Sequence, residues 1–245
     1  MRTALFSLVA FGCSLMLYTP AAGIVGDASP ADSSLARYAV MVTTDRTLCS
    51  GIVLAQNLVL TAAHCVFDTS KVSVVFSGST AANAIEIVVH PRFNTVKNSS
   101  ADLALLKISE LLPSRFASAY LAAQPARVDD HLTVVGFGMA VDGNKDSAGT
   151  ARMAMLTVVS ARFNSPLVLT AINGSREASC GGDSGGPVFA TRSGVPSLVG
   201  VVMAGNEDFW SNSSRCGGNT FVVPILSYRE WIVETADKLG SSLGR

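Results

Sequence analysis

The chain has 245 residues, of which 18 are lysine or arginine and 18 are aspartate or glutamate, so its formal net charge is zero. This balance argues against a protein that binds nucleic acid by neutralising phosphates. Hydrophobic residues make up 49% of the chain and charged residues 15%, which excludes a disordered protein. The length allows one or two domains with a sizeable buried core.

Residues 1–23 have the features of a secretory signal peptide. Arg2 precedes an apolar stretch over residues 5–17, and small residues follow at 21–23. A membrane anchor is disfavoured because the stretch is shorter than the roughly 20 residues that span a bilayer. A lipid anchor on Cys13 is disfavoured because Phe11 stands where a small residue is expected. We therefore expect a secreted protein, extracellular or periplasmic, with no membrane attachment after cleavage.

The remaining sequence predicts an all-β fold. Short β-rich runs alternate with clusters of glycine, serine and asparagine, and no amphipathic helices are interleaved with them. Only the end of the chain predicts a helix, where residues 227–230 fit a capping box. The predicted strands cover residues 38–43, 51–54, 58–61, 72–76, 85–89, 103–108, 132–136, 155–159, 198–203 and 220–223.

Four cysteines remain after residues 1–23 are removed: Cys49, Cys65, Cys180 and Cys216. An even number of cysteines in an exported chain predicts two disulfides, and three pairings are possible. The sequence contains neither an HExxH motif nor a paired-cysteine metal pattern, so we expect no metal and no cofactor.

Three short motifs contain the residues of a nucleophilic site. Ser184 lies among four glycines in residues 180–188, where the backbone amides can converge on an anion. His64 lies between small residues and a cysteine, and Asp102 opens an apolar strand. Each motif alone also fits a purely structural role: a glycine-rich turn, a core histidine or a loop carboxylate. Together they supply a nucleophile, a base and an acidic residue that orients the base.

The order of these residues discriminates between folds that carry such a site. A G-x-S-x-G elbow needs its histidine after the serine, but all three histidines, at positions 64, 90 and 131, precede Ser184. A subtilisin-like order needs an acidic residue before His64; Asp32 and Asp45 precede it, but neither lies in a comparable motif. The order His64, Asp102, Ser184 is that of chymotrypsin.

With these motifs in this order, the chain resembles the trypsin/chymotrypsin family of serine endopeptidases. The resemblance covers nearly the whole mature chain and includes residues 24–27, 49–65, 90–93, 135–138 and 228–232. It implies two packed antiparallel β-barrels with the active site between them. We expect a protease domain over residues 24–245, with a first barrel at about 24–118, a second at about 119–224 and a helix at about 225–240.

The resemblance implies a role for each residue of the site. Ser184 attacks the scissile carbonyl, His64 transfers the proton, and Asp102 orients the imidazole. The backbone amides of Gly182 and Ser184 form the oxyanion hole. The expected function is that of a secreted endopeptidase acting through an acyl-enzyme. His90 is expected to be part of a structural turn, and His131 is expected to lie on the surface.

The resemblance also implies an ion pair between the α-amino group of Ile24 and Asp183. The residue before Ile24 is Gly23, where a basic residue is usual in the family, so we expect signal cleavage itself to generate Ile24. Asp27 stands where a second glycine is usual. The implied disulfides are Cys49–Cys65 and Cys180–Cys216.

The expected substrate pocket is uncharged. The resemblance places Ala178 at its base, so no carboxylate is available for a substrate lysine or arginine. A preference for small or medium apolar side chains follows, with Glu207 as the one acidic residue that could fold inward. The other expected pocket residues are Ser179, Met203, Ala204, Gly205 and Thr220.

Two other functions fit the same fold: an inactive family member that serves as a binding module, and an esterase. The complete triad favours the active endopeptidase. Its expected partners are polypeptide substrates and protein inhibitors, and it is expected to be a monomer. Asn98, Asn173 and Asn212 lie in N-glycosylation sequons, which matter only in a eukaryotic secretory pathway.

Overall fold

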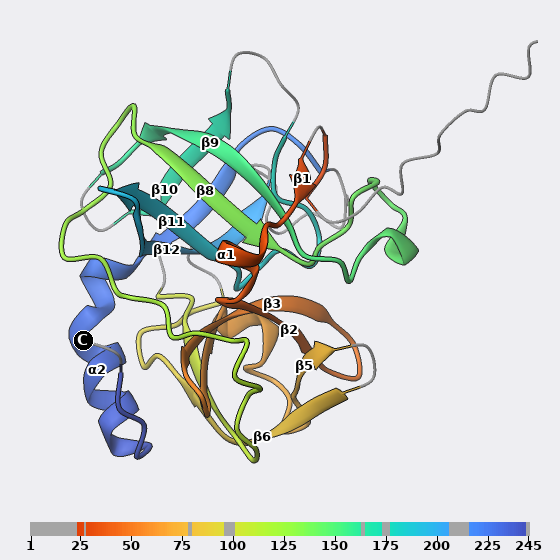
Figure 1. The fold of residues 1–245 in the computed structure, drawn as a ribbon, viewed down its shortest axis with the longest axis vertical. Helices are drawn as coiled ribbons and strands as arrows, with labels where there is room; N and C mark the ends of the chain where they lie inside the picture. Colours follow the sequence, from red (N-terminus) through yellow and green to blue (C-terminus); the bar gives the residue numbers. More distant parts are fainter. Residues whose placement is uncertain are drawn as a thin grey trace, which may run out of the picture.

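The computed structural model describes residues 24–26, 28–77, 80–95, 101–162, 165–172, 177–205 and 216–243. Two closed antiparallel β-barrels are stacked in this part of the chain, and a helix at the C-terminal end lies beside them (Figure 1). The predicted all-β fold with two barrels and a terminal helix is therefore confirmed. The signal segment and the three sequons lie outside the described residues, and none of the described helices is long and apolar enough to cross a membrane.

The first barrel closes in the order β2-β3-β4-β7-β6-β5. Its strands are β2 (Ala39–Thr43), β3 (Leu48–Ala55), β4 (Leu58–Thr61), β5 (Ser73–Ser77), β6 (Thr80–Val89) and β7 (Ala104–Ile108).

The second barrel runs in the order β9-β10-β13-β12-β11-β8 and closes through the pairing of β8 with β9. Its strands are β8 (His131–Gly136), β9 (Arg152–Ser160), β10 (Leu167–Ala171), β11 (Pro187–Arg192), β12 (Val195–Gly205) and β13 (Thr220–Pro224). The loop between β8 and β9 contains a short 3-10 helix, η2 (Lys145–Ser147).

Two strands of the first barrel, β4 and β7, have apolar side chains on both faces. On β4, Leu58 and Leu60 pack in a cluster shared by both barrels, whereas Val59 packs inside the first barrel. On β7, Leu105 and Leu106 divide between the same two clusters. Successive side chains of a strand point to opposite faces, so a strand buried on both faces appears in the sequence as a continuous apolar run.

The N-terminal segment packs on the second barrel, although it precedes the first. The short strand β1 (Ser29–Pro30) pairs with β9, and Val25 forms an isolated bridge with Ala178. The Asp32 side chain then caps the short helix α1 (Ser33–Ala36) by accepting hydrogen bonds from the amides of Ser34 and Leu35, after which the chain enters β2. This location differs from the sequence-based division, which placed residues 24–30 with the first barrel.

All ten predicted runs correspond to strands, but β1, β10 and β11 were missed. Pro166 immediately precedes β10, and Pro187 is the first residue of β11. A proline is compatible with a strand at this position because it removes no hydrogen bond from the interior of the sheet. In the sequence it nevertheless reads as a turn signal.

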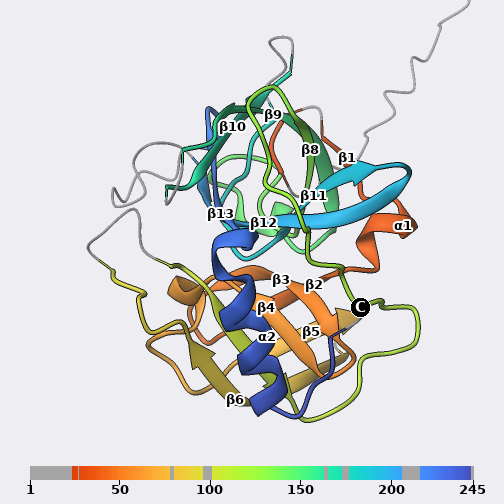
Figure 2. The same ribbon diagram turned by 90° about the vertical axis from the view of Figure 1, so that its left-hand side faces the viewer.

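The chain ends in the 3-10 helix η3 (Ile225–Tyr228) and the helix α2 (Arg229–Lys238). The predicted capping box is wrong: Tyr228 is the N-cap residue, and no side chain caps the helix. Pro224 leads directly into the 3-10 turn, so the helix needs no separate start signal. Figure 2 shows α2 lying along the first barrel, where Lys107 donates a hydrogen bond to Ser241.

Candidate active site

His64 and Asp102 lie together beyond the ends of two paired strands. His64 lies in the 3-10 helix η1 (Ala63–Cys65), which begins two residues after β4 ends, and Asp102 lies two residues before β7 begins. Thr61 of β4 is the register partner of Ala104 of β7. The antiparallel pairing therefore places residues 38 positions apart in the sequence at one edge of the first barrel.

The carboxylate of Asp102 binds His64 at two points. One oxygen, Oδ2, lies 2.7 Å from His64 Nδ1, and the other, Oδ1, accepts a hydrogen bond of 2.8 Å from the His64 backbone amide. Asp102 is 2% exposed and the His64 side chain 24% exposed. A carboxylate accepts but does not donate, so the proton of the imidazole is held on Nδ1 and Nε2 is left with a lone pair.

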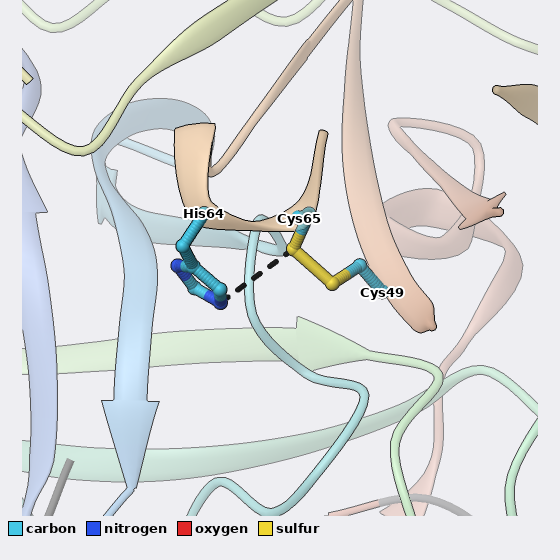
Figure 3. Close-up of side chains that lie close together, drawn as sticks. All are labelled: Cys49, His64 and Cys65. Atoms are coloured by element: carbon cyan, nitrogen blue, oxygen red, sulfur yellow. Dashed lines mark hydrogen bonds between the residues drawn. A yellow bond between two sulfur atoms is a disulfide. The ribbon is translucent and has the colours of Figure 1, made fainter. Parts of the chain in front are cut away.

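The disulfide between Cys49 and Cys65 packs against the imidazole of His64. Figure 3 shows the imidazole of His64 next to this disulfide, with Nε2 3.6 Å from Cys65 Sγ. The same sulfur lies 4.0 Å from the carbonyl oxygen of Ser184. A disulfide sulfur carries no proton, so these are packing contacts, and they bring the histidine and the serine loop to one sulfur atom.

Ser184 lies in the loop that leads into β11 of the second barrel. Its hydroxyl donates a hydrogen bond of 3.2 Å to the carbonyl of Met203 on β12. Its own carbonyl accepts a hydrogen bond of 2.8 Å from the Ser50 amide on β3. The loop is thus held between strands of both barrels, and Ser184 lies at their junction.

Two backbone amides of the serine loop are the predicted oxyanion-hole donors. Within the part of the chain that the structure describes, neither Gly182 nor Ser184 donates its N–H to a protein acceptor. Gly182 has φ = +103°, and a Cβ at this position would approach Gly138 and Leu48 too closely. Glycine is therefore required for the conformation that leaves these two donors free.

Asp183 lies between Gly182 and Ser184 in the serine loop, and its side chain is fully buried. Its two oxygens accept hydrogen bonds of 2.8 Å from the amides of Gly138 and Cys180. Burial raises the pKa of Asp183 to about 7, and these two hydrogen bonds and the charge of Arg152 oppose the shift only in part.

Ile24 is fully buried, and the next residue, Val25, donates a hydrogen bond of 3.2 Å to Ala178. No ion pair joins Ile24 to Asp183 among the residues that the structure covers. In the full chain Ile24 follows Gly23 through a peptide bond and has no free amine. The expected pair is therefore tested only in a chain that begins at Ile24.

The residues predicted for the substrate pocket adjoin one another on the second barrel. Gly205 on β12 is the register partner of Thr220 on β13, and Thr220 Oγ1 accepts a hydrogen bond of 3.0 Å from the Ser179 amide. Ala178, Ser179 and Thr220 are fully buried, and Met203 and Ala204 nearly so. All of these residues are uncharged, and Glu207 lies outside the described residues.

A second disulfide joins Cys180, four residues before the serine, to Cys216. The two cysteine pairs are those that the resemblance implies. Both pairs also lie near a third possible metal ligand, His64 for the first and Asp142 for the second. Sulfurs bonded to each other are not thiolates, so in the oxidised protein neither group has the ligands that a metal site needs.

The other two histidines lie as the sequence predicts, one in a structural position and one on the surface. His90 is buried, accepts a hydrogen bond from the Arg92 amide, and packs edge-on against Tyr228 and Trp231. It thereby connects the first barrel to the terminal helix. His131 is exposed and pairs with Thr157.

One residue that contacts the serine loop was not predicted from the sequence. Ser50 is fully buried on β3, and its hydroxyl is hydrogen-bonded to both Gly182 and Phe137 of the second barrel. The only available signal was a serine in an otherwise apolar strand next to Cys49. That signal does not reveal partners that lie 87 and 132 positions away.

The chain is similar in sequence to several curated proteases. It is 26% identical over 227 residues to vitamin K-dependent protein C of Rattus norvegicus, covering 79% of this chain and 47% of that protein. It is also 26% identical over 233 residues to trypsin-3 of Homo sapiens, covering 86% of this chain and 72% of that protein. The chain spans about half the length of the protein C relatives from Rattus norvegicus and Mus musculus.

The fold and the family agree with this similarity. A solved structure of neuropsin, described as a serine protease expressed in the limbic system of mouse brain, matches with a TM-score of 0.70 at 20% identity. The match covers 86% of this chain and 99% of that one, and at this identity it shows the fold. The family model for trypsin matches residues 24–232, and the chain therefore belongs to the trypsin family of serine proteases.

Proposed function

We propose that the protein is a secreted serine endopeptidase whose triad is His64, Asp102 and Ser184. The observation that carries this proposal is the pair of contacts, 2.7 and 2.8 Å, through which buried Asp102 orients His64. This orientation leaves Nε2 with the lone pair that a general base needs to take the proton of Ser184.

The reaction follows from the chemistry of these groups. Ser184 Oγ attacks the carbonyl carbon of the substrate while His64 Nε2 takes its proton, and the carbonyl oxygen becomes an oxyanion held by the amides of Gly182 and Ser184. The imidazolium, stabilised by Asp102, gives the proton to the leaving amine, and an acyl-enzyme remains. Water then repeats the sequence and releases the acid.

The uncharged pocket residues support a preference for small or medium apolar side chains on the acyl side of the cleaved bond. Thr220 is hydrogen-bonded to the Ser179 amide, so its side chain lies over the residues expected at the pocket base. A buried lysine or arginine of the substrate would find no carboxylate among Ala178, Ser179 and Thr220. Polypeptides are the proposed substrates, and protein inhibitors that fill the same pocket are proposed partners.

Export through residues 1–23 and a monomeric state complete the proposal. The domain boundaries proposed for the mature enzyme are residues 24–245, with signal cleavage after Gly23. N-terminal sequencing of the secreted protein tests the cleavage site, and gel filtration tests the monomer.

Labelling with a fluorophosphonate, combined with a peptide cleavage assay, tests the activity. The wild type should be labelled at Ser184 and should cleave peptides. Ser184→Ala should not be labelled and should keep only the residual catalysis of about 10³–10⁴-fold over water that binding and the oxyanion hole provide. Ser109→Ala, which changes an exposed serine after β7, is the matched control and should behave as the wild type.

Each alternative predicts a different result in this assay. A binding module would show no adduct in the wild type, whereas an esterase would be labelled and would cleave ester but not peptide substrates. Peptide cleavage by Ser184→Ala at the wild-type rate would contradict the triad.

A further inference from the structure

One hydroxyl from the first barrel is bonded to two loops of the second. Ser50 Oγ donates a hydrogen bond of 2.8 Å to the Gly182 carbonyl and accepts one of 3.0 Å from the Phe137 amide. A serine hydroxyl has one proton and two lone pairs, so it makes both bonds at the same time. The backbone amide of Ser50 adds the third bond, to the Ser184 carbonyl. This one buried residue therefore contacts the oxyanion loop at two points.

The peptide that Ser50 holds lies between the two oxyanion donors. The Gly182 carbonyl and the Asp183 amide belong to one peptide plane, and the amides of Gly182 and Ser184 flank it. The Asp183 amide donates a hydrogen bond of 3.0 Å to the Cys180 carbonyl, so the plane is held at both ends. Rotation of this plane would turn the flanking N–H groups away from a common point.

Glycine makes such a rotation easy. Gly182 occupies the left-handed region at φ = +103°, and a residue without Cβ also has access to other regions. The hydrogen bond from Ser50 opposes the rotation because breaking it leaves the proton of the buried hydroxyl without an acceptor and the Gly182 carbonyl without its donor.

We propose that Ser50 is a positioning residue for the oxyanion hole. Its hydroxyl holds the Gly182–Asp183 peptide so that the N–H groups of Gly182 and Ser184 converge on the substrate oxyanion. The residue acts across the interface between the barrels, so the docking of the first barrel sets the geometry of a site built by the second. The inference rests on the proposed function, since it concerns the same reaction.

Ser50→Ala tests the proposal, with Ser241→Ala as the matched control. Ser241 is also a buried serine whose hydroxyl takes part in two side-chain hydrogen bonds, to Asn57 and Lys107, but it lies away from the oxyanion loop. Ser50→Gly is the second variant, because the space left by the side chain allows a water molecule to bridge Gly182 and Phe137.

The assays are kcat and KM on one peptide substrate, the affinity of a peptide aldehyde, and the thermal midpoint. An aldehyde forms a hemiacetal with Ser184 whose oxygen occupies the oxyanion hole, so it reports on the same donors. Ser50→Ala should lower kcat about tenfold and leave KM within about twofold. It should also weaken the binding of the aldehyde about tenfold. The kcat and the aldehyde affinity of Ser50→Gly should lie between those of Ser50→Ala and the wild type. Ser241→Ala should lower only the thermal midpoint.

Two results would overturn the inference while the proposed function stands. One is an active wild type with unchanged kcat in both folded Ser50 variants. The other is a fall in kcat with no change in aldehyde affinity. That result would show that the substitution lowers kcat without moving the oxyanion-hole donors. A wild type that neither cleaves peptides nor reacts with a fluorophosphonate would instead overturn the proposed function, and the inference with it.

Discussion

Asp102 contacts His64 through both of its carboxylate oxygens, one at the ring nitrogen Nδ1 and one at the backbone amide. The backbone contact fixes the position of the residue, and the ring contact fixes its tautomer. Because the two contacts come from one buried carboxylate, the orientation of the imidazole is tied to the local backbone of η1. A substitution that preserves the shape of Asp102 but not its charge separates the two effects.

Asp102→Asn should therefore preserve the fold and lower kcat by about 10⁴-fold, because an amide can donate to Nδ1 and so favours the wrong tautomer. Steady-state kinetics on a peptide substrate measure this loss. Asp68→Asn, which changes an exposed carboxylate paired with Arg46 in the same barrel, is the control and should leave kcat unchanged. A loss of less than about tenfold in Asp102→Asn would show that His64 does not depend on this carboxylate.

Thr220→Gly should enlarge the substrate pocket. Thr220 is fully buried, and its removal frees the space over the Ser179 amide. The ratio of kcat/KM for a phenylalanine substrate to that for an alanine substrate should rise by about tenfold or more. Thr220→Ser keeps the hydroxyl and should change this ratio less. Efficient cleavage after lysine or arginine by the wild type would contradict the uncharged pocket.

Asp183→Asn should lower the activity of a chain that begins at Ile24 by about 10²-fold, the loss expected when an oxyanion-hole donor is misplaced. The new amide group faces the amides of Gly138 and Cys180, which need acceptors, and the charge proposed to pair with the Ile24 amine is lost. Kinetics on this variant, beside a chain that retains Gly23 before Ile24, measure the effect. Unchanged activity in Asp183→Asn would show that the proposed N-terminal pair is wrong.

The stability gained by freeing the Ile24 amine should depend on pH. In the full chain burial raises the pKa of Asp183 from 3.8 to about 7, so its contribution to stability is complete below pH 3.8 and is lost as the pH rises through 7. A free ammonium at Ile24 would stabilise the ionised form and remove this loss. The difference in unfolding free energy between the chain that begins at Ile24 and the chain that retains Gly23 should grow between about pH 4 and 7, by up to about 4 kcal/mol. A difference that is constant with pH would contradict the pair.

His90 should make the protein sensitive to acid. Burial, with a smaller effect from the charge of Arg92, lowers the pKa of His90 from 6.5 to about 4. The stability held by the neutral imidazole is therefore present above pH 6.5 and is lost as the pH falls through 4. Urea unfolding of the wild type should show a loss of up to about 3 kcal/mol between pH 7 and 4. His90→Phe should flatten this part of the pH profile, and His131→Phe, on an exposed histidine, should not.

The sequence by itself determined which residues of this protein are candidates for catalysis and where most of its strands lie. His64, Asp102 and Ser184 each lie in a short motif, and their order along the chain is that of chymotrypsin and excludes a G-x-S-x-G elbow, which needs its histidine after the serine. The ten predicted runs became strands because their signal is local: apolar and β-branched residues between turn residues. The apolar runs at β4 and β7 even indicate that both faces are buried.

Only the tertiary structure decided how distant segments meet. It placed Val25 and residues 29–30 on the second barrel, gave the terminal helix a start without a capping box, and added strands next to Pro166 and Pro187. It also brought Ser50 to Gly182 across 132 positions. A hydrogen bond of this kind produces no periodic or compositional pattern in the sequence. Its partners are brought together by the closure and docking of two barrels, and interactions between neighbours in the chain do not determine them.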